Sequence, residues 1–424
     1  MRVFKGIQEL VTMSGAAKKD GRHIVEADLQ IIRHAAIIED RGVICWVGPE
    51  SKLKSVLNSN LVSKNKSVIK NKSKAKVVNL NAECVIPAFL ECHTHLVFAG
   101  DRKHEFELRN QGATYKQIAE QGGGIQFTVR QTRKCSEANL LKEAQRRSDR
   151  FLSQGVTTLE VKSGYGLTER DEMKILKVAQ HIQNMRIVGT YLGPHAIPEG
   201  RTPQDYLDEV CEKTLPKIKK QKLAERVDMF VEGGYYSLQQ AKQYYSKAQK
   251  LGFRLTGHVE QMSRLGGAEY LSSLSADSID HLVEVNHDDI LKIAKSDSTA
   301  VLLPTSDLYL KMNYPPAREL LDRGARVALA TDFNPGTSPT QDLSLVGVLS
   351  RLEMKMTLPE VLSAYTVGAA CALNHQKVLG SVEVGKKCDF AVLEGSWRDL
   401  FYQVGHHPVA QTYKDGQRIF LKKS

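Results

Sequence analysis

The sequence predicts an α/β protein: a (β/α)8 TIM-like barrel with a small β domain built from both ends of the chain. Three observations predict it. The 424 residues exceed the ~250 that one such barrel needs. The middle of the chain alternates apolar, β-branched runs with helical or loop stretches, whereas both ends read as short strands. We expect residues 86–374 to form the barrel, and residues 1–85 with 375–424 to form the β domain.

The amino-terminal end is rich in short strand patterns. Residues 35–38 read as a strand, residues 39–42 as a charged turn and residues 43–48 as the returning strand. Residues 385–393 and 409–413 have the same character at the other end of the chain. We therefore expect the two ends to pair with each other.

The middle of the chain contains eight apolar runs of strand length. They are residues 85–96, 156–163, 187–195, 227–232, 253–260, 278–283, 300–304 and 326–332. Strands that alternate with helices form a parallel sheet, and eight such repeats close into a barrel.

Several intervening helices carry recognisable start signals. Ser136 can cap the helix that follows it, and Thr168 with Asp171 resembles a capping box. Thr202 precedes Pro203, which suits the first position of a helix. These signals support the alternating pattern.

The bulk composition is that of an ordinary soluble protein. No window approaches the ~18 consecutive apolar residues of a membrane span, and the start of the chain lacks the apolar core of a secretory signal. The seven cysteines are scattered, without a C-x-x-C pair, which argues against disulfides and a structural zinc site. We expect a cytoplasmic protein with no membrane partner.

The net charge of +11 is concentrated in one segment. Residues 51–76 contain eight lysines and no acid, so this segment carries +8 and the rest of the chain carries +3. The segment lacks arginine and interleaved aromatic residues, which favours a solvated insertion over a nucleic-acid site. We expect no nucleic-acid partner.

His93 and His95 are the most informative residues of the chain. They lie two apart after an apolar run, so their side chains point to the same face of a strand. His258 and Asp332 end two later runs. Active sites of these barrels lie at the carboxyl ends of the strands, and a catalytic metal needs roughly three or four protein ligands. The sequence therefore predicts a metal site at these four residues. We place Cys92 behind the strand, because neighbouring strand residues face opposite ways.

Other polar residues at strand ends are candidates for catalysis and substrate binding. His281 is the best candidate for a general base or electrostatic partner, and Asp332 could pass a proton to a leaving nitrogen. Arg102 could bind a carboxylate with two hydrogen bonds, although Arg109, Arg130 or Arg133 could replace it. Other candidates at strand ends are Tyr165, His195 and, as a partner that orients a metal ligand, Glu260. The glycine run 122–124 lacks nucleotide-binding spacing.

The chain resembles the imidazolonepropionase family of the amidohydrolase superfamily. The matching segments are residues 93–102, 104–109, 121–125, 160–167, 192–196, 265–268 and 330–336. The resemblance covers nearly the whole chain and implies a barrel with a β-sandwich formed by both termini. It implies hydrolysis of 4-imidazolone-5-propanoate to N-formimidoyl-L-glutamate in histidine degradation.

The resemblance also implies roles for individual residues. It implies one divalent or trivalent metal ion, zinc or iron, on His93, His95, His258 and Asp332, with His281 assisting attack on the ring carbonyl. Arg102 would hold the propanoate carboxylate. The other substrate contacts that it implies are Tyr165, His195, Asn334, Gly336 and Thr337. A homodimer is plausible on family precedent.

Two features depart from the family. Gln261 occupies a position where relatives often carry Glu, so we expect Gln261 to bind substrate by hydrogen bonds while His281 and Asp332 do the base work. The lysine-rich segment 51–76 is longer than the usual connection.

Two rival interpretations are a metal-dependent deaminase of a cyclic amidine and a catalytically inactive scaffold. Glu260 is one residue away from where a deaminase needs its glutamate, and an inactive scaffold has no need of a complete ligand set.

Overall fold

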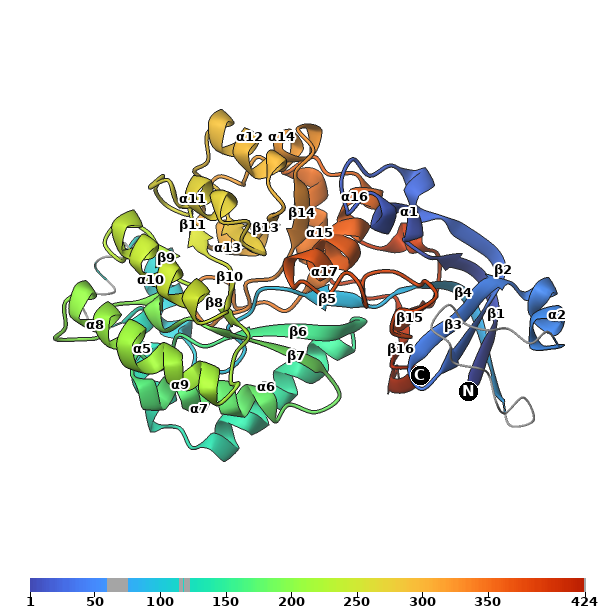
Figure 1. Ribbon diagram of the computed structural model, residues 1–424, viewed down its shortest axis with the longest axis horizontal. Coiled ribbons are helices and arrows are strands. Elements are labelled where there is room, and N and C mark those ends of the chain that lie inside the picture. Colours follow the sequence, from blue (N-terminus) through green and yellow to red (C-terminus); the bar gives the residue numbers. More distant parts are fainter. Residues whose placement is uncertain (59–74, 114–116, 118–122, 423–424) are drawn as a thin grey trace. The chain divides into compact units, whose positions relative to one another are not determined.

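The computed structural model describes residues 1–58, 75–113, 117 and 123–422 (Figure 1). It contains two compact units. The barrel unit comprises Glu91–Asp149 and Thr158–Asp342, and the terminal unit comprises Met1–Leu90, Arg150–Thr157 and Leu343–Ser424. Most of the lysine-rich insertion, and Gly122 of the glycine run, lie outside the described residues.

A parallel sheet runs through the middle of the chain. Its described strands are β5 (Phe89–Glu91), β6 (Val156–Lys162), β7 (Arg186–Tyr191), β8 (Arg226–Val227), β9 (Phe230–Val231), β10 (Arg254–Leu255), β11 (His258–Val259), β12 (Ser278–His281), β13 (Thr299–Leu302) and β14 (Arg326–Leu329). They hydrogen-bond in the orders β10-β8-β7-β6-β5 and β14-β13-β12-β11-β9.

The two halves join into one curved sheet. The fourth strand run consists of β8 and β9, the fifth consists of β10 and β11, and each of these runs contributes to both halves. Thr94 forms a parallel bridge with Phe333, and the N–H of His95 donates to the carbonyl oxygen of Phe333 at 2.9 Å. The segments after the first and last strands therefore meet, and the sheet closes as a TIM-like barrel, as the sequence predicts.

Helices follow most of the strands, as the sequence predicts. Those described between residues 103 and 322 are α3 (Lys103–Asn110), α5 (Ile125–Lys134), α6 (Glu137–Leu152), α7 (Glu169–Gln180), α8 (Pro203–Glu209), α9 (Leu215–Lys220), α10 (Leu238–Lys250), α11 (Gly267–Ser273), α12 (His287–Lys295), α13 (Pro304–Leu310) and α14 (Ala317–Asp322). The predicted starts are confirmed: Thr168 and Thr202 accept the N–H groups of Asp171 and Asp205, and Ser136 accepts that of Asn139. In Figure 1, α7 runs beside β7.

The terminal unit is built on one mixed sheet. Its strands are β1 (Arg2–Val11), β2 (Ile31–Asp40), β3 (Val43–Pro49), β4 (Lys76–Pro87), β15 (Phe390–Leu393), β16 (Val409–Lys414) and β17 (Gln417–Leu421), in the order β17-β16-β15-β4-β1-β2-β3. β4 pairs with β1 on one side and with β15 on the other, so strands from both ends of the chain share the sheet.

Aromatic packing ties the two ends of the chain together in this sheet. The ring of Phe390 lies 5.0 Å from that of Phe4 and stacks on Tyr413 at 4.5 Å. All three side chains are buried, and burial of such large apolar surfaces is the main stabilising contribution to a core.

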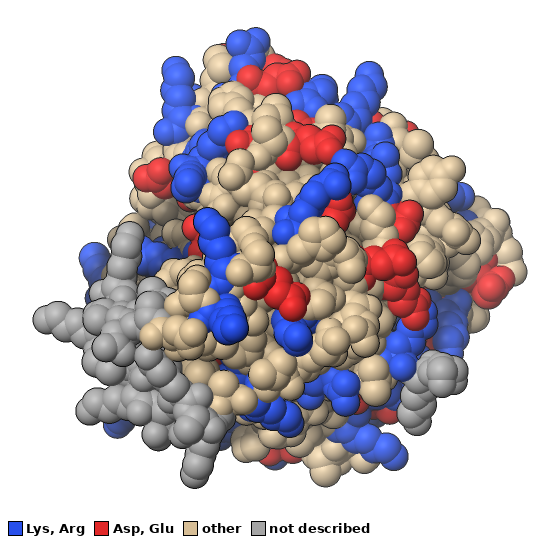
Figure 2. All heavy atoms as spheres, turned by 90° about the vertical axis from the view of Figure 1, so that its right-hand side faces the viewer, with Lys and Arg blue, Asp and Glu red and all other residues tan. Residues whose placement is uncertain are grey.

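The remaining helices also belong to the terminal unit. They are α1 (Ser14–Lys18), α2 (Leu53–Asn58), α15 (Leu343–Leu352), α16 (Leu358–Ser363) and α17 (Ala369–Ala372). Among the described residues, no helix has the length and apolar character needed to cross a membrane. On the face shown in Figure 2, basic and acidic side chains are interspersed over the described surface.

Candidate metal centre and catalytic site

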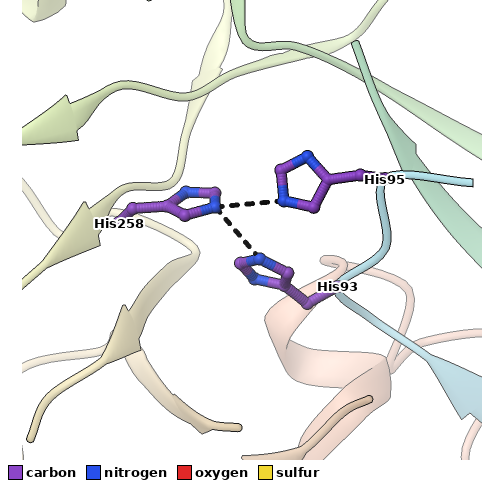
Figure 3. Close-up of side chains that lie close together, drawn as sticks. All are labelled: His93, His95 and His258. Atoms are coloured by element: carbon purple, nitrogen blue, oxygen red, sulfur yellow. Dashed lines mark hydrogen bonds between the residues drawn. The ribbon is translucent and has the colours of Figure 1, made fainter. Parts of the chain in front are cut away.

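Three histidines converge at the carboxyl ends of barrel strands. His93 and His95 follow β5, and His258 opens β11. The Nε2 atom of His258 lies 3.1 Å from Nε2 of His93 and 3.4 Å from Nε2 of His95 (Figure 3). All three side chains are buried, and the cluster could hold a metal ion.

The surroundings of the rings show that these residues fit a cation. Nδ1 of His93 lies 2.7 Å from Asp280 Oδ2, and Nδ1 of His258 lies 3.0 Å from Asp228 Oδ2, although off the line of a good hydrogen bond. A carboxylate at Nδ1 favours the tautomer with the proton there, which leaves a lone pair on Nε2. The two Nε2 atoms, 3.1 Å apart, are close enough to share a proton in a hydrogen bond or to face a common cation.

Asp332 completes the set of candidate ligands. Its Oδ1 atom lies 3.5 Å from Nε2 of His95 and 3.6 Å from Nε2 of His93. Burial by itself would raise the pKa of Asp332, but its interaction with His95 lowers the pKa, so the carboxyl group is ionised. Burial also holds the pKa of His93 well below its usual value. Neutral imidazoles and an ionised carboxylate are the states that bind metals.

Four buried charged residues lie behind the histidines, and we call them the carboxylate layer: Glu160, Lys162, Asp228 and Asp280. Nζ of Lys162 donates to Glu160 Oε1 at 3.0 Å and to Asp228 Oδ2 at 2.8 Å. It lies 3.5 Å from Asp280 Oδ2. One ammonium group faces three carboxyl groups, so Lys162 offsets only part of the negative charge of the layer, and the remainder suits a neighbouring cation.

A cavity of about 290 Å³ opens beside the three histidines. Its lining residues are His95, Arg102, Ile125, Tyr165, His195, Phe230, Tyr235, His258, Gln261, Met262, His281, Leu310, Met312, Asp332, Asn334 and Thr337. The cavity therefore brings together eight of the nine residues that the sequence predicts for catalysis and substrate binding, and two of the three histidines of the metal cluster. Gly336 and His93 are not among its lining residues.

His281 lies within reach of the candidate metal ligands. Its ring centroid is 5.1 Å from that of His258, and neither ring nitrogen has a hydrogen-bond partner among the described residues. Burial, with the nearby His258, lowers the pKa of His281 to about 3. The imidazole is therefore neutral near pH 7 and can both donate and accept a hydrogen bond.

Arg102 supplies a positive charge at the cavity wall. Its Nε and Nη1 atoms are buried without a hydrogen-bond partner in the described structure, and the nearest carboxylate is Glu105 at 3.8 Å. A Cβ atom added at Gly336 would lie 1.0 Å from Arg102 Nη2, so the absence of a side chain at Gly336 makes room for the guanidinium group. Unpartnered guanidinium donors beside a cavity fit a carboxylate ligand.

The alternative arginines have other partners. Arg109 donates to the carbonyl oxygen of Gly336 at 3.2 Å, Arg130 pairs with Glu199 at 2.9 Å, and Arg133 donates to the carbonyl oxygen of Gly166 at 2.7 Å. None of these three lines the cavity. The geometry therefore favours Arg102 over them.

Aromatic rings and an amide form other parts of the wall. The ring of His195 stacks on that of His95 at 4.8 Å and 17°, and its Nδ1 lies 3.1 Å from the carbonyl oxygen of Gly164. The ring of Tyr165 lies 5.7 Å from that of His95. Nε2 of Gln261 donates to Ser306 Oγ at 3.5 Å.

A tight loop after β14 shapes the remaining wall. Oδ1 of Asn334 accepts the N–H groups of Gly336 at 2.8 Å and Thr337 at 2.7 Å. Nδ2 of Asn334 donates to the carbonyl oxygen of Asp332 at 2.7 Å. This loop fixes the direction in which the Asp332 carboxylate leaves its strand.

Three strand ends turn through left-handed backbone conformations. φ is +49° at Glu260, +80° at His281 and +50° at Asp332. Such values are strained for residues with a Cβ atom, and such strain concentrates at active sites.

The expectation that Glu260 orients a ligand is wrong: its carboxylate accepts the backbone N–H groups of residues 265–268 instead.

Sequence reasoning missed the partners of the ligands. The carboxylates of Asp228 and Asp280 lie beside Nδ1 of His258 and of His93, and the available signal was an acid inside an otherwise apolar strand run. It also missed Asp307 of α13, whose carboxyl oxygens are buried without a hydrogen-bond partner in the described structure. Burial, with the charge of Asp332, raises the pKa of Asp307 to about 8.

Comparison with known proteins identifies the family to which the chain belongs. Residues 84–419 match the model of the amidohydrolase family. A protein of Bdellovibrio bacteriovorus named imidazolonepropionase is 48% identical over 419 residues, covering 99% of this chain and 96% of that protein. An imidazolonepropionase of Clostridium tetani is 35% identical, covering 99% and 98%.

Solved structures of other proteins have a fold similar to that of this chain. An adenosine deaminase from Xanthomonas campestris with bound zinc superposes with a TM-score of 0.72 at 15% identity, covering 99% of this chain and 93% of that one. Guanine deaminase of E. coli superposes with a TM-score of 0.71 at 14% identity, covering 100% and 99%. At such low identity these likenesses concern the fold alone. The family match and the full-length identities go further: the chain belongs to the amidohydrolase family and, within it, to the imidazolonepropionases.

Proposed function

We propose that the protein hydrolyses the cyclic amide of 4-imidazolone-5-propanoate to N-formimidoyl-L-glutamate, a step of histidine degradation. One observation carries the proposal: a single cavity is lined by histidines of a possible metal cluster and by the guanidinium of Arg102, whose Nε and Nη1 lack a hydrogen bond in the described structure. A substrate with a ring amide and a carboxylate side chain matches both. The kinship with imidazolonepropionases supports the same reaction.

The metal ligands would be His93, His95, His258 and Asp332. A zinc or iron ion held there would polarise the ring carbonyl and lower the pKa of water. Three imidazoles and one carboxylate suit either zinc or iron.

The chain's own groups would move protons and hold the substrate. In the net reaction, the oxygen of water bonds to the ring carbonyl carbon, the C–N bond breaks and a proton reaches the leaving nitrogen. Neutral His281 accepts a hydrogen bond from the attacking water or donates one to the carbonyl oxygen. Asp332 carries the proton onward to nitrogen.

Binding of the substrate would be shared around the cavity wall. Arg102 holds the propanoate carboxylate, and Gly336 leaves room for its guanidinium group. The other contacts are Tyr165, His195, Gln261, Asn334 and Thr337. Gln261 binds by its amide, because an amide has no basic group with which to take a proton.

Other parts of the sequence interpretation stay predictions. They are the division into residues 1–85 with 375–424 and residues 86–374, the β-sandwich form of the terminal unit, and a homodimer.

The test is direct turnover. 4-Imidazolone-5-propanoate is unstable and would be made in place from urocanate by urocanase. We expect loss of imidazolone absorbance and appearance of formimidoylglutamate with metal-loaded enzyme, and neither with chelator-stripped enzyme. No turnover with metal bound would contradict the proposal, and release of ammonia from guanine or cytosine would then identify a deaminase.

A further inference from the structure

Lys162, the last residue of β6, is a buried ammonium group surrounded by carboxylates. Its Nζ lies within 3.0 Å of Glu160 and Asp228 and 3.5 Å from Asp280. Burial alone would lower the pKa of Lys162, but Asp228, Glu160 and Asp280 together raise it. The side chain therefore carries its positive charge inside the barrel.

Two of these carboxylates connect Lys162 to the histidines. Asp228 Oδ2 lies 2.8 Å from Lys162 Nζ and 3.0 Å from His258 Nδ1. Asp280 Oδ2 lies 3.5 Å from the same Nζ and 2.7 Å from His93 Nδ1. In each case one oxygen atom faces both the ammonium group and an imidazole.

We propose that Lys162 is a positioning residue of the metal centre, which holds Asp228 and Asp280 so that Nε2 of His258 and of His93 faces the ion. Without the ammonium charge, two buried carboxylates would repel each other, and one would turn away or take up a proton. Its histidine would then lose the carboxylate beside Nδ1, which helps to orient the ring. The inference rests on the proposed metal-dependent function.

His95 provides an internal comparison. Nδ1 of His95 and Nδ1 of His258 both lack a hydrogen-bond partner in the described structure, but only His258 has a carboxylate, that of Asp228, 3.0 Å from this atom. The ring of His95 stacks instead on that of His195. Lys162 therefore reaches two of the three histidines and leaves the third to aromatic packing.

A different role for Lys162, as a carboxylated bridge between two metal ions, fits the geometry poorly. Carboxylation requires a neutral amine with a lone pair. The three neighbouring carboxylates stabilise the ammonium form instead. We therefore expect one metal ion per chain.

The experiment is a titration of chelator-stripped full-length protein with Co²⁺. The parent chain is compared with K162M, and the D228N/D280N variant is compared with the same variant that also carries K162M. We expect K162M to weaken Co²⁺ binding by about 10-fold or more and to change the visible spectrum of the bound ion, as for other residues that orient ligands. In the D228N/D280N background, K162M should change neither. Unchanged binding in the parent background, or an equal loss in both backgrounds, would overturn the proposal.

A second pair of variants guards against misfolding, because K162M leaves three carboxylates without their cation. K162R keeps the charge but moves it, so its cobalt spectrum should differ from that of the parent. E160Q is the matched control. Glu160 contacts Lys162 but contacts none of the three histidines, so the cobalt spectrum of E160Q should match that of the parent. An unchanged K162R spectrum, or an E160Q spectrum altered as much as that of K162R, would contradict the proposal. Substrate is absent throughout, so failure of the hydrolysis reaction would not be mistaken for failure here.

Discussion

The carboxylate layer and the cavity wall of the same barrel unit differ in what their buried charged groups face. In the layer, Lys162 lies against all three acids, and two of these acids contact histidines. Along the wall, Arg102 and His281 keep nitrogen atoms without a partner in the described structure. Unpaired buried polar groups are costly, so those that line a cavity indicate where a ligand supplies the missing partners.

The largest effect is expected where the two regions meet. Asp332→Ala removes the carboxylate nearest to His93 and His95, and it should abolish both metal binding and turnover. The loss of metal affinity should exceed the ~100-fold upper range for residues that merely orient ligands. Metal content and circular dichroism would be measured together. A folded variant that retains its metal would show that Asp332 is not a ligand.

His281→Ala tests the wall alone. The histidine ligands stay in place, so metal content should match the parent, while turnover should fall by ~10²-fold or more, the usual scale for loss of acid–base catalysis. The measurement is kcat with metal content determined on the same sample. Parental kcat would show that the proposed role of His281 is wrong.

Arg102→Ala tests the charge of the wall. Loss of charge-assisted hydrogen bonds costs about 1.5–3 kcal/mol each, so KM should rise by roughly 10- to 100-fold with a smaller change in kcat. Arg130→Ala is the matched control, because Arg130 pairs with Glu199 and does not line the cavity. Equal KM values for parent and Arg102→Ala would remove Arg102 from the binding site.

The smallest effect on turnover, but a clear one on stability, is expected at Asp307. Its pKa near 8 exceeds the ordinary ~3.9 of an unfolded chain, so the folded state binds more protons between these values. The contribution of Asp307 to the free energy of unfolding should therefore be greatest below about pH 4. It should fall as the pH rises to about 8. Asp307→Asn should remove that fall, worth on the order of a few kcal/mol. Thermal unfolding from pH 5 to 8 measures it, and parallel curves for the two chains would contradict the assignment.

The sequence predicts most of the barrel and the cavity because both depend on local patterns. Eight apolar runs mark the strands, and a polar residue at a run's end marks the site, as for His258 and Asp332. The carboxylate layer was beyond such reasoning. The contact between Lys162 and Asp228 joins the end of β6 to the residue that follows β8, and only the register of the sheet decides that they meet. Glu260 shows the converse, since its place beside His258 suggested a partner but its carboxylate caps a loop.

The closure of the barrel has a consequence for how the chain folds. Glu91 accepts the N–H groups of both His93 and Thr331, which joins segments 240 residues apart in sequence. Contacts between such distant residues carry the largest loop-closure entropy and favour slow folding. His93, His95 and Asp332 flank this junction, so the ligand set exists only after the first and last strands have met. A bound ion would in turn slow their separation, so the amide hydrogens along this junction should exchange faster in metal-free protein than in metal-loaded protein.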